Sequence, residues 1–388
     1  QDAGVLPTPP VCTALVHSSA LTGDLQTTMK LFQSMHKLGF RHGEGTYALV
    51  LPLLMKQSPQ DHLMSFMQEM KANRYPVDGL ASNALMGILL DGHTIPACEC
   101  YKVFMSMSVE INSRVSRHIM EASLKDGLYD VANMAVERLM KSGFTADLRM
   151  YTLILSCFSR CEVMDKEACI MSMLSSTNHS AHKFLCGLLT SPEQRNDSAL
   201  NFVRLYFESL EHEVDEKLAR WFTCVLLNYL VLMGQIKRAR CVWKVAYEKK
   251  LFPNRILFDQ ELVWSLDVRA LSIGAALTAI VHTLHRFRKR MIHYHTIPRR
   301  IKIVTGSTLN DPIQDLLKPL DSPFENHGGA LRCRGAYVAQ WFNKPIVEKF
   351  LENELPSRDE LVMQKVNMLF PRPKPEPYML IVNSATSF

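Results

Sequence analysis

The stretch GDLQTTMKLFQSMHKLGF, which runs from Gly23 to Phe40, decides the fold because its pattern returns twice. It recurs as GLYDVANMAVERLMKSGF from Gly127 and as GQIKRARCVWKVAYEKKLF from Gly234. Each copy has a glycine, a helix with apolar residues three to four positions apart, and a closing Gly or Lys before an apolar or aromatic residue. Such a recurrence indicates a repeat architecture.

A second apolar-periodic stretch precedes these helices, and its equivalent positions fall at a constant step. These positions are Thr13, Ala48, Asn83, Arg117 and Thr152, at steps of 35, 35, 34 and 35 residues. Two helical patterns per period predict antiparallel helix pairs that bury their open apolar faces on their neighbours. We therefore expect an N-terminal extension at residues 1–9 and then an α-solenoid of about seven 35-residue helix-turn-helix units over residues 10–254. Its first helices would line a concave groove.

The unit resembles the pentatricopeptide repeat. The matching features are the Thr-Tyr type start (Thr46-Tyr47, Met150-Tyr151), the mid-unit glycine, a small residue in the second helix (Ala132, Ala199, Ala239), a Phe-x-x-Met pair (Phe32 and Met35, Phe104 and Met107) and a closing Asp or Asn. The tryptophan-led signature of the tetratricopeptide repeat is absent. The resemblance implies single-stranded RNA binding in an organelle, with one base per repeat read by two side chains. We expect a mitochondrion rather than a plastid.

Carried over by this resemblance, the base-reading residues are those of the Thr13 series and those that close each unit. The implied RNA-binding residues are Thr13, Asp78, Asn83, Asn112, Arg117, Asp147, Thr152 and Asn254. Only Asn83 with Asn112 has the form of a family base-reading pair, which would favour pyrimidines. Ala48, Phe184 and Cys224 lack the hydrogen-bonding groups that base discrimination requires. We expect weak sequence selectivity, and the alternative is a solenoid that serves mainly as a protein scaffold.

After Asn254 the period stops, and a β-α-β pattern replaces it. A polar stretch rich in Pro and Gly, at 309–331, separates this unit from a further helix and a closing strand. We expect residues 255–388 to form a small α/β sandwich domain with a Pro-rich C-terminal tail. The predicted strands are 262–268, 299–306 and 377–383, and the predicted helices start at Ser272 and Gly335.

Two of these segments, LDVRALSIGAAL from Leu266 and IKIVTG from Ile301, resemble the small MutS-related (Smr) domain. This domain follows the repeats in a subset of pentatricopeptide repeat proteins. In its active nucleases, the acidic residue and the histidine of an LDxH motif lie beside a TGxG turn. The resemblance therefore implies a phosphodiester-cleaving site near these segments.

The chain departs from that motif at two positions. Asp267 remains, but Arg269 stands where the family has histidine, and the turn that starts with Thr305 and Gly306 has Thr308 instead of its second glycine. A fixed cation cannot take up a proton as a general base must. We expect a degenerate, non-catalytic domain, and the alternative is an Smr-type RNA endonuclease or processing factor guided by its repeats.

One cationic strip stands out between Val281 and Ile303, where seven basic residues occur without an acid. Histidines, Phe287 and Tyr294 are interleaved. Cations neutralise phosphates, and arginine planes and aromatic rings stack on bases, so this composition favours RNA contact. The alternative is a helix C-terminus whose cations complement its dipole, followed by a solvated loop. The basic residues are Arg286, Arg288, Lys289, Arg290, Arg299, Arg300 and Lys302.

The composition excludes other classes of protein. The 388 residues are 47% hydrophobic and 21% charged with a net charge of +6, as in a soluble globular protein. No uncharged apolar run approaches the roughly 20 residues that span a bilayer, so no membrane insertion is expected. The ten cysteines form no CxxC pair, and nucleotide and zinc-protease motifs are absent, so no metal or cofactor is expected. We expect a non-catalytic component of a large ribonucleoprotein, such as the mitochondrial ribosome, that binds single-stranded or ribosomal RNA and neighbouring proteins.

Overall fold

The computed structural model describes residues 8–57, 60–160, 164–190, 196–253, 256–259 and 262–352, and all structural statements concern these residues. The chain divides into two compact units. One comprises residues 1–146 and 162–177, and the other comprises residues 147–161 and 178–388. Asn254 and the predicted strand at 377–383 lie outside the described residues.

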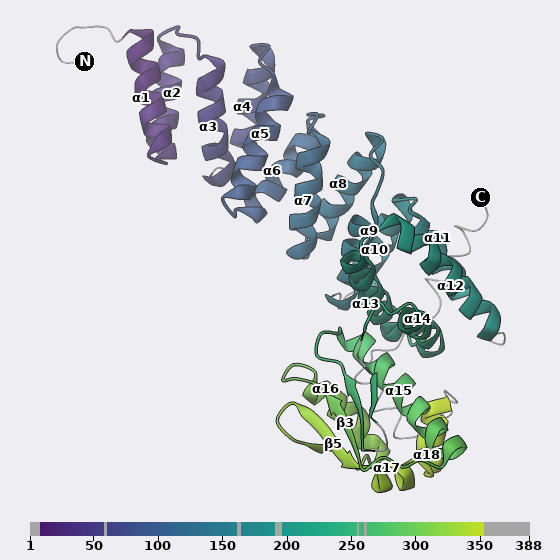
Figure 1. Cartoon of the computed structure of the whole chain (residues 1–388). Coiled ribbons are helices and arrows are strands. Elements are labelled where there is room, and N and C mark those ends of the chain that lie inside the picture. The colour runs from purple at the N-terminus through teal and green to yellow at the C-terminus, as the bar shows by residue number, and fades with distance from the viewer. Residues whose placement is uncertain are drawn as a thin grey trace. The chain divides into compact units, whose positions relative to one another are not determined.

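The first unit consists of helices that pack side by side in successive pairs (Figure 1). Among the first helices, α1 packs on α3, α3 on α5 and α5 on α7; among the second helices, α4 packs on α6, α6 on α8 and α8 on α10. A two-helix period predicts this packing. The bounds are α1 (Pro9–Leu21), α2 (Leu25–Lys37), α3 (Glu44–Gln57), α4 (Gln60–Ala72), α5 (Val77–Leu90), α6 (Thr94–Ser106), α7 (Ser113–Lys125), α8 (Tyr129–Lys141) and α10 (Met164–Ser176).

The recurring glycine of the repeat has a conformational cause. Gly23 between α1 and α2 has a φ of 79°, and Gly127 between α7 and α8 has a φ of 72°. Glycine adopts this left-handed region without the steric cost that a Cβ brings. The tight turn inside each of these helix pairs therefore explains why the pattern Gly-plus-helix returns in the sequence.

The second unit begins with further helices. Here α9 packs directly against α13, and α12 packs against α14. The bounds are α9 (Leu148–Ser156), the 3-10 helix η1 (Cys157–Arg160), α11 (Ser180–Thr190), α12 (Asn196–Glu213), α13 (Glu216–Leu232) and α14 (Ile236–Glu248).

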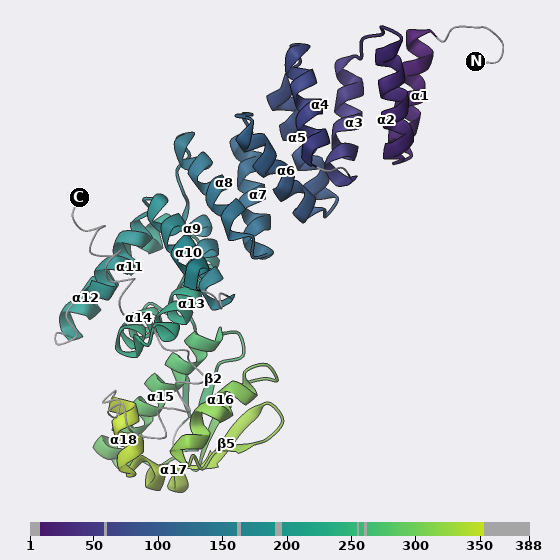
Figure 2. The ribbon, with the colours of Figure 1, turned by 180° about the vertical axis from the view of Figure 1, so that it is seen from behind.

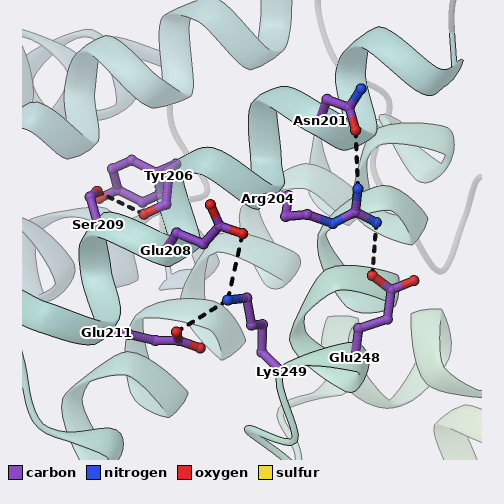
Figure 3. Close-up of polar contacts among 8 residues, drawn as sticks. All are labelled: Asn201, Arg204, Tyr206, Glu208, Ser209, Glu211, Glu248 and Lys249. Carbon is purple, nitrogen blue, oxygen red and sulfur yellow. Dashed lines mark hydrogen bonds and ion pairs between the residues drawn. The ribbon is translucent and has the colours of Figure 1, made fainter.

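Ion pairs connect α12 to the end of α14, as Figure 3 shows. Arg204 Nη2 lies 3.0 Å from Glu248 Oε2, and Lys249 Nζ lies 3.1 Å from Glu211 Oε2 and 3.7 Å from a Glu208 carboxylate oxygen. All of these side chains are partly exposed to solvent. Exposed pairs of this kind each contribute about 0.2–1 kcal/mol, so they fix the local geometry more than they stabilise the fold.

A five-stranded sheet of order β1-β2-β3-β5-β4 follows the helices. The neighbours β2 and β3 are parallel and are connected by α15, so the predicted β-α-β unit is present, while the other pairings are antiparallel. The bounds are β1 (Ile256–Asp259), β2 (Val263–Asp267), α15 (Ile273–Tyr294), β3 (Arg300–Val304), α16 (Asn310–Leu317), the 3-10 helix η2 (Lys318–Leu320), β4 (Glu325–Asn326), β5 (Ala330–Arg334), α17 (Gly335–Phe342) and α18 (Pro345–Glu352). The sequence interpretation missed β1, β4, β5 and α16.

The two faces of this sheet differ in character. One face is apolar and buried, and Trp264, Ile301 and Leu331 on it are 2% exposed or less. Helix α15 covers this face (Figure 1 and Figure 2). The ring of Trp264 on β2 lies 5.2 Å from the ring of Phe287 on α15. Since successive side chains of a strand alternate between faces, the remaining side chains of β2, β3 and β5 lie on the opposite face. We call this opposite face, formed by Val263, Ser265, Asp267, Arg300, Lys302, Val304, Ala330, Arg332 and Arg334, the open sheet face.

Candidate nucleic-acid interface

The predicted base-reading residues on the first helices differ in exposure. Asn83 on α5 is exposed, and Thr13 on α1 and Arg117 on α7 are half-buried. Thr152 on α9 is fully buried, and its hydroxyl donates to Leu148 O at 2.7 Å. A buried hydroxyl that is already bonded cannot contact a base, so we leave Thr152 out of the interface.

The capping residues define at which residue a helix begins, which apolar periodicity alone does not. Three first helices start with a side-chain oxygen that accepts the backbone N–H three residues further on: Asn112 for α7 at 2.8 Å, Asp147 for α9 at 2.7 Å and Asp215 for α13 at 2.7 Å. Counted from its cap, Arg117 is the fifth residue of this pattern, and Arg220 is its equivalent on α13. From the repeat period, Cys224 was expected at the position that Arg220 occupies. The difference arises because α13 is 17 residues long and begins one turn earlier than expected.

Arg117 and Arg220 are held in similar ways. Arg117 Nε lies 3.3 Å from Glu121 Oε1, and its guanidinium lies 5.7 Å from the centre of the Phe144 ring. Arg220 pairs with Glu216 and donates from Nε to a backbone carbonyl oxygen at 2.6 Å. An acid one helical turn away positions each guanidinium while leaving it partly exposed.

The predicted residues that close the units have bonds to the backbone. The Asp78 carboxylate accepts the N–H of Glu110 at 2.8 Å, and Asn112 and Asp147 cap the following helices as described above. All three residues remain exposed. Their polar side chains therefore have a structural role that is independent of any contact with a base.

The residues of the degenerate Smr-like motif come together at one edge of the sheet. Asp267 is the last residue of β2, and Thr305 and Gly306 follow β3, which is parallel to β2. Arg269 binds Asp267 through two guanidinium nitrogens, with Nη2–Oδ2 at 2.8 Å and Nε–Oδ1 at 3.1 Å. This hydrogen-bonded carboxylate raises the pKa of Arg269. Since both carboxylate oxygens accept from a permanent cation, the arrangement does not provide a free base at Asp267.

Sequence reasoning missed the segment that completes this edge. Gly329 O accepts the backbone N–H groups of Thr305 at 3.0 Å and Gly306 at 2.9 Å, and the Thr305 hydroxyl donates to Asn310 Oδ1 at 3.1 Å. A Cβ on Gly329 would lie 3.4 Å from the backbone of Gly306. The consecutive glycines at 328 and 329 were the available signal, since such a pair permits close approach of two backbones.

The cationic strip is continuous in sequence but divided in space. Its α15 residues lie on the helix that covers the buried face of the sheet, whereas Arg300 and Lys302 are on the open sheet face. Three of the α15 cations contact protein groups. Arg286 lies 5.0 Å from the centre of the Tyr247 ring, Arg290 lies 5.7 Å from the centre of the Trp264 ring, and Arg288 is ion-paired with Glu348.

The remaining cations of the strip are Lys289 on α15, Arg299 before β3, and Arg300 and Lys302 on β3. Lys289, Arg299 and Arg300 are exposed, and Lys302 is half-buried. The α15 cations precede the last turn of the helix, in which His293 is the basic residue, so complementing the helix dipole does not account for them. RNA contact by the exposed cations stays a prediction.

The described residues contain no cluster of three or more His, Cys, Asp or Glu side chains that could hold a metal ion. Within the same residues, no helix combines the length and apolarity that crossing a membrane requires.

These features define a protein of paired helices followed by a mixed α/β region, in which an aspartate at the sheet edge is bound by an arginine. No protein-family model matches the chain. The chain is 52% identical over 308 residues to a pentatricopeptide repeat-containing protein of Arabidopsis thaliana that is named as mitochondrial, in a match that covers 79% of this chain and 37% of the relative. Another Arabidopsis thaliana pentatricopeptide repeat-containing protein is 31% identical over 193 residues, which are 46% of this chain and 22% of that relative. The chain is thus similar to pentatricopeptide repeat-containing proteins and spans well under half the length of these two relatives.

Solved structures show a weaker likeness. The pentatricopeptide repeat protein PPR10 from maize aligns with 99% of this chain and 53% of its own, at a TM-score of 0.35 and 12% identity. A structure of PPR10 in complex with an 18-nt psaJ RNA element aligns with 76% of this chain and 38% of its own, at a TM-score of 0.33 and 15% identity.

Proposed function

We propose that this chain is the RNA-binding, non-catalytic part of an organellar pentatricopeptide repeat protein. The observation that carries the proposal is the polar, accessible character of the reading positions on the first helices, above all Asn83 and Arg117. Asn83 offers an amide to a base edge, and Arg117 offers a guanidinium to a phosphate or a base plane. With few such positions, we expect weak sequence selectivity.

A charge-removing variant tests the groove directly. We expect Arg117→Ala to weaken binding of single-stranded RNA by the 388-residue chain and to lower the slope of log K against log[salt] by about 0.7, because one phosphate contact on a single strand is lost. Lys141→Ala is the matched control, since Lys141 is an exposed cation on the second helix of the same pair. Fluorescence anisotropy with a labelled oligonucleotide over a salt series measures both quantities. Equal effects of the two variants would reject the groove.

The compartment and the assembly are part of the same proposal. The relative with 52% identity is named as mitochondrial, while a relative with 25% identity over 223 residues is named as chloroplastic, so we propose a mitochondrion with the plastid as the alternative. We further propose that the protein is a fixed component of a large ribonucleoprotein, such as the mitochondrial ribosome, where neighbouring proteins make a strict sequence code unnecessary. Sedimentation of the native protein at moderate salt tests this, because a component must migrate with ribosomal RNA.

A further inference from the structure

The open sheet face holds two pairs of like charges in direct opposition. In the antiparallel pairing of β3 with β5, Arg300 is the partner of Arg334, and Lys302 is the partner of Arg332. Directly opposed residues of an antiparallel pair are on the same face, with Cβ atoms about 4.5–5.5 Å apart, and like charges in such positions are destabilising. Four cations in this arrangement repel one another, and a bound anion would offset that repulsion.

Within the part of the chain that the structure describes, the protein itself places little negative charge beside these cations. None of the four cations has an ion-pair partner there. The two nearest acids in the register are Glu325, which lies opposite Arg332 on β4, and Asp267 on β2, which is bound by Arg269. Glu325 offsets part of the charge of Arg332, whereas no acid of the described strands lies opposite Arg300, Lys302 or Arg334. Arg300, Arg332 and Arg334 are exposed, so a ligand can reach them.

The spacing of the four cations fits a polymer of phosphates. Neighbouring strands are about 4.8 Å apart, and residues that share a face recur about every 6.6 Å along a strand. Three of the four are arginines, whose planar fork binds a phosphate through two parallel hydrogen bonds. A ligand with regularly repeated anionic groups can neutralise both pairs at once, whereas a single ion cannot.

We propose that the Arg300–Arg334 and Lys302–Arg332 pairs form a surface that binds the phosphate backbone of single-stranded RNA without reading its sequence. The choice of RNA over other polyanions rests on the proposed function above. The surface is on the same face as Asp267 and is formed by β5 as much as by β3. Strand β5 contributes Arg332 and Arg334, which are not part of the cationic strip defined from the sequence.

The test is the double variant Arg332→Gln/Arg334→Gln of the 388-residue chain, with Lys102→Gln/Lys141→Gln as a control of equal charge change. Lys102 and Lys141 are exposed on second helices of the repeats. We expect the sheet variant to lower the salt slope of RNA binding by about 1.4, at roughly 0.7 per phosphate contact on a single strand. The loss of affinity should be equal for poly(U) and poly(A). The control variant should bind as the wild type does.

Three outcomes would overturn the inference, and each leads to a different conclusion. If Arg117→Ala weakens binding and the sheet variant does not, the surface is rejected while the groove remains. If poly-glutamate displaces RNA from the wild type but not from the sheet variant, at equal charge concentration, the surface is a site for acidic protein segments. If the wild type binds no RNA, the proposed function itself fails. Loss of fold would not imitate the expected result, because removal of opposed cations should leave the thermal midpoint unchanged or raise it in low salt.

Discussion

At the residue scale, the Asp267–Arg269 pair sets the chemistry of the sheet edge. Arg269 places a permanent charge 2.8 Å from the Asp267 carboxylate, at the position where the Smr resemblance implies a histidine. The hydrogen bonds and the charge of Arg269 stabilise the ionised carboxylate, which makes Asp267 a weaker base towards water. What remains is a surface residue pair next to a glycine turn.

We expect the chain to show no RNA cleavage that depends on Asp267. Wild type and Asp267→Ala should leave a single-stranded RNA substrate equally intact on a denaturing gel, with and without added divalent cation. Asp321→Ala serves as the control for removal of an acid, because Asp321 is exposed and follows η2. Cleavage by the wild type that Asp267→Ala abolishes and Asp321→Ala retains would restore the endonuclease alternative.

The sequence predicted the residues of this edge better than it predicted the cationic surface. The resemblance to the Smr motif identified Asp267, Arg269 and Gly306, and the predicted β-α-β pattern agrees with their placement at one edge, because parallel strands have their carboxyl ends together. Arg332 and Arg334 were not recognised, although the segment LRCR alternates as a half-buried strand does, because a strand of five residues gives a short signal at the end of a stretch rich in Pro and Gly. Burial of Thr152 could not be predicted either, since it depends on the helices packed against α9.

At the element scale, close packing of α15 on α13 depends on one missing side chain. The backbone N–H of Gly274, in the first turn of α15, donates to Asn228 Oδ1 at 2.7 Å. A Cβ at this position would lie 2.6 Å from Asn228 Cα, a contact with backbone that cannot move aside cheaply. Helix α15 therefore packs this closely on α13 because residue 274 is glycine.

We expect Gly274→Ala to reduce the free energy of unfolding by about 1–3 kcal/mol through overpacking. Gly87→Ala is the matched control. Gly87 is an exposed interior residue of α5 with nothing within 4 Å of a built Cβ, so alanine there should stabilise the chain by up to about 1 kcal/mol. Urea denaturation followed by circular dichroism measures both changes. Destabilisation by both variants to the same extent would contradict the contact.

The elements themselves were predictable to different degrees. Long amphipathic helices with glycine turns were found because the 3.6-residue period and the cap residues act locally. Strands β1, β4 and β5 were missed because a strand of two to five residues gives too little periodicity to recognise. The short helix α16, of 8 residues, was missed as well. The early start of α13 escaped detection because apolar periodicity fixes a helix face and not its first residue, which the Asp215 cap defines.

At the scale of the whole molecule, buried histidines make stability depend on pH. Burial lowers the pKa of His282 to about 3, with nearby Arg240 and Arg286 acting in the same direction. Burial also lowers the pKa of His42, His179 and His182. Because these folded-state values lie below the ordinary 6.5, the unfolded chain binds more protons once the pH falls below 6.5. Their contribution is therefore fully present above 6.5 and is lost as the pH falls towards 3.

We expect the free energy of unfolding to fall between pH 7 and pH 5, with roughly 1–2 kcal/mol of the loss due to His282. His282→Gln should remove that part of the pH dependence. His93→Gln is the control, because His93 is exposed between α5 and α6. Urea midpoints at pH 5, 6 and 7 are the measurement. An unchanged pH dependence in His282→Gln would show that this histidine titrates normally in the folded chain.

The last strand pairing has a consequence for solubility. Among the described residues, β4 pairs with β5 at Leu331 and Arg332, so within this part of the chain the β5 backbone towards Arg334 is an edge that another extended segment could pair with. Charged side chains on such an edge discourage association with a second sheet, as gatekeepers against aggregation. Arg332 and Arg334 thus disfavour self-association of the protein through this edge. Variants that neutralise them should be examined by light scattering before their affinity is interpreted, since a self-associated sheet would bind RNA poorly for a reason unrelated to phosphate.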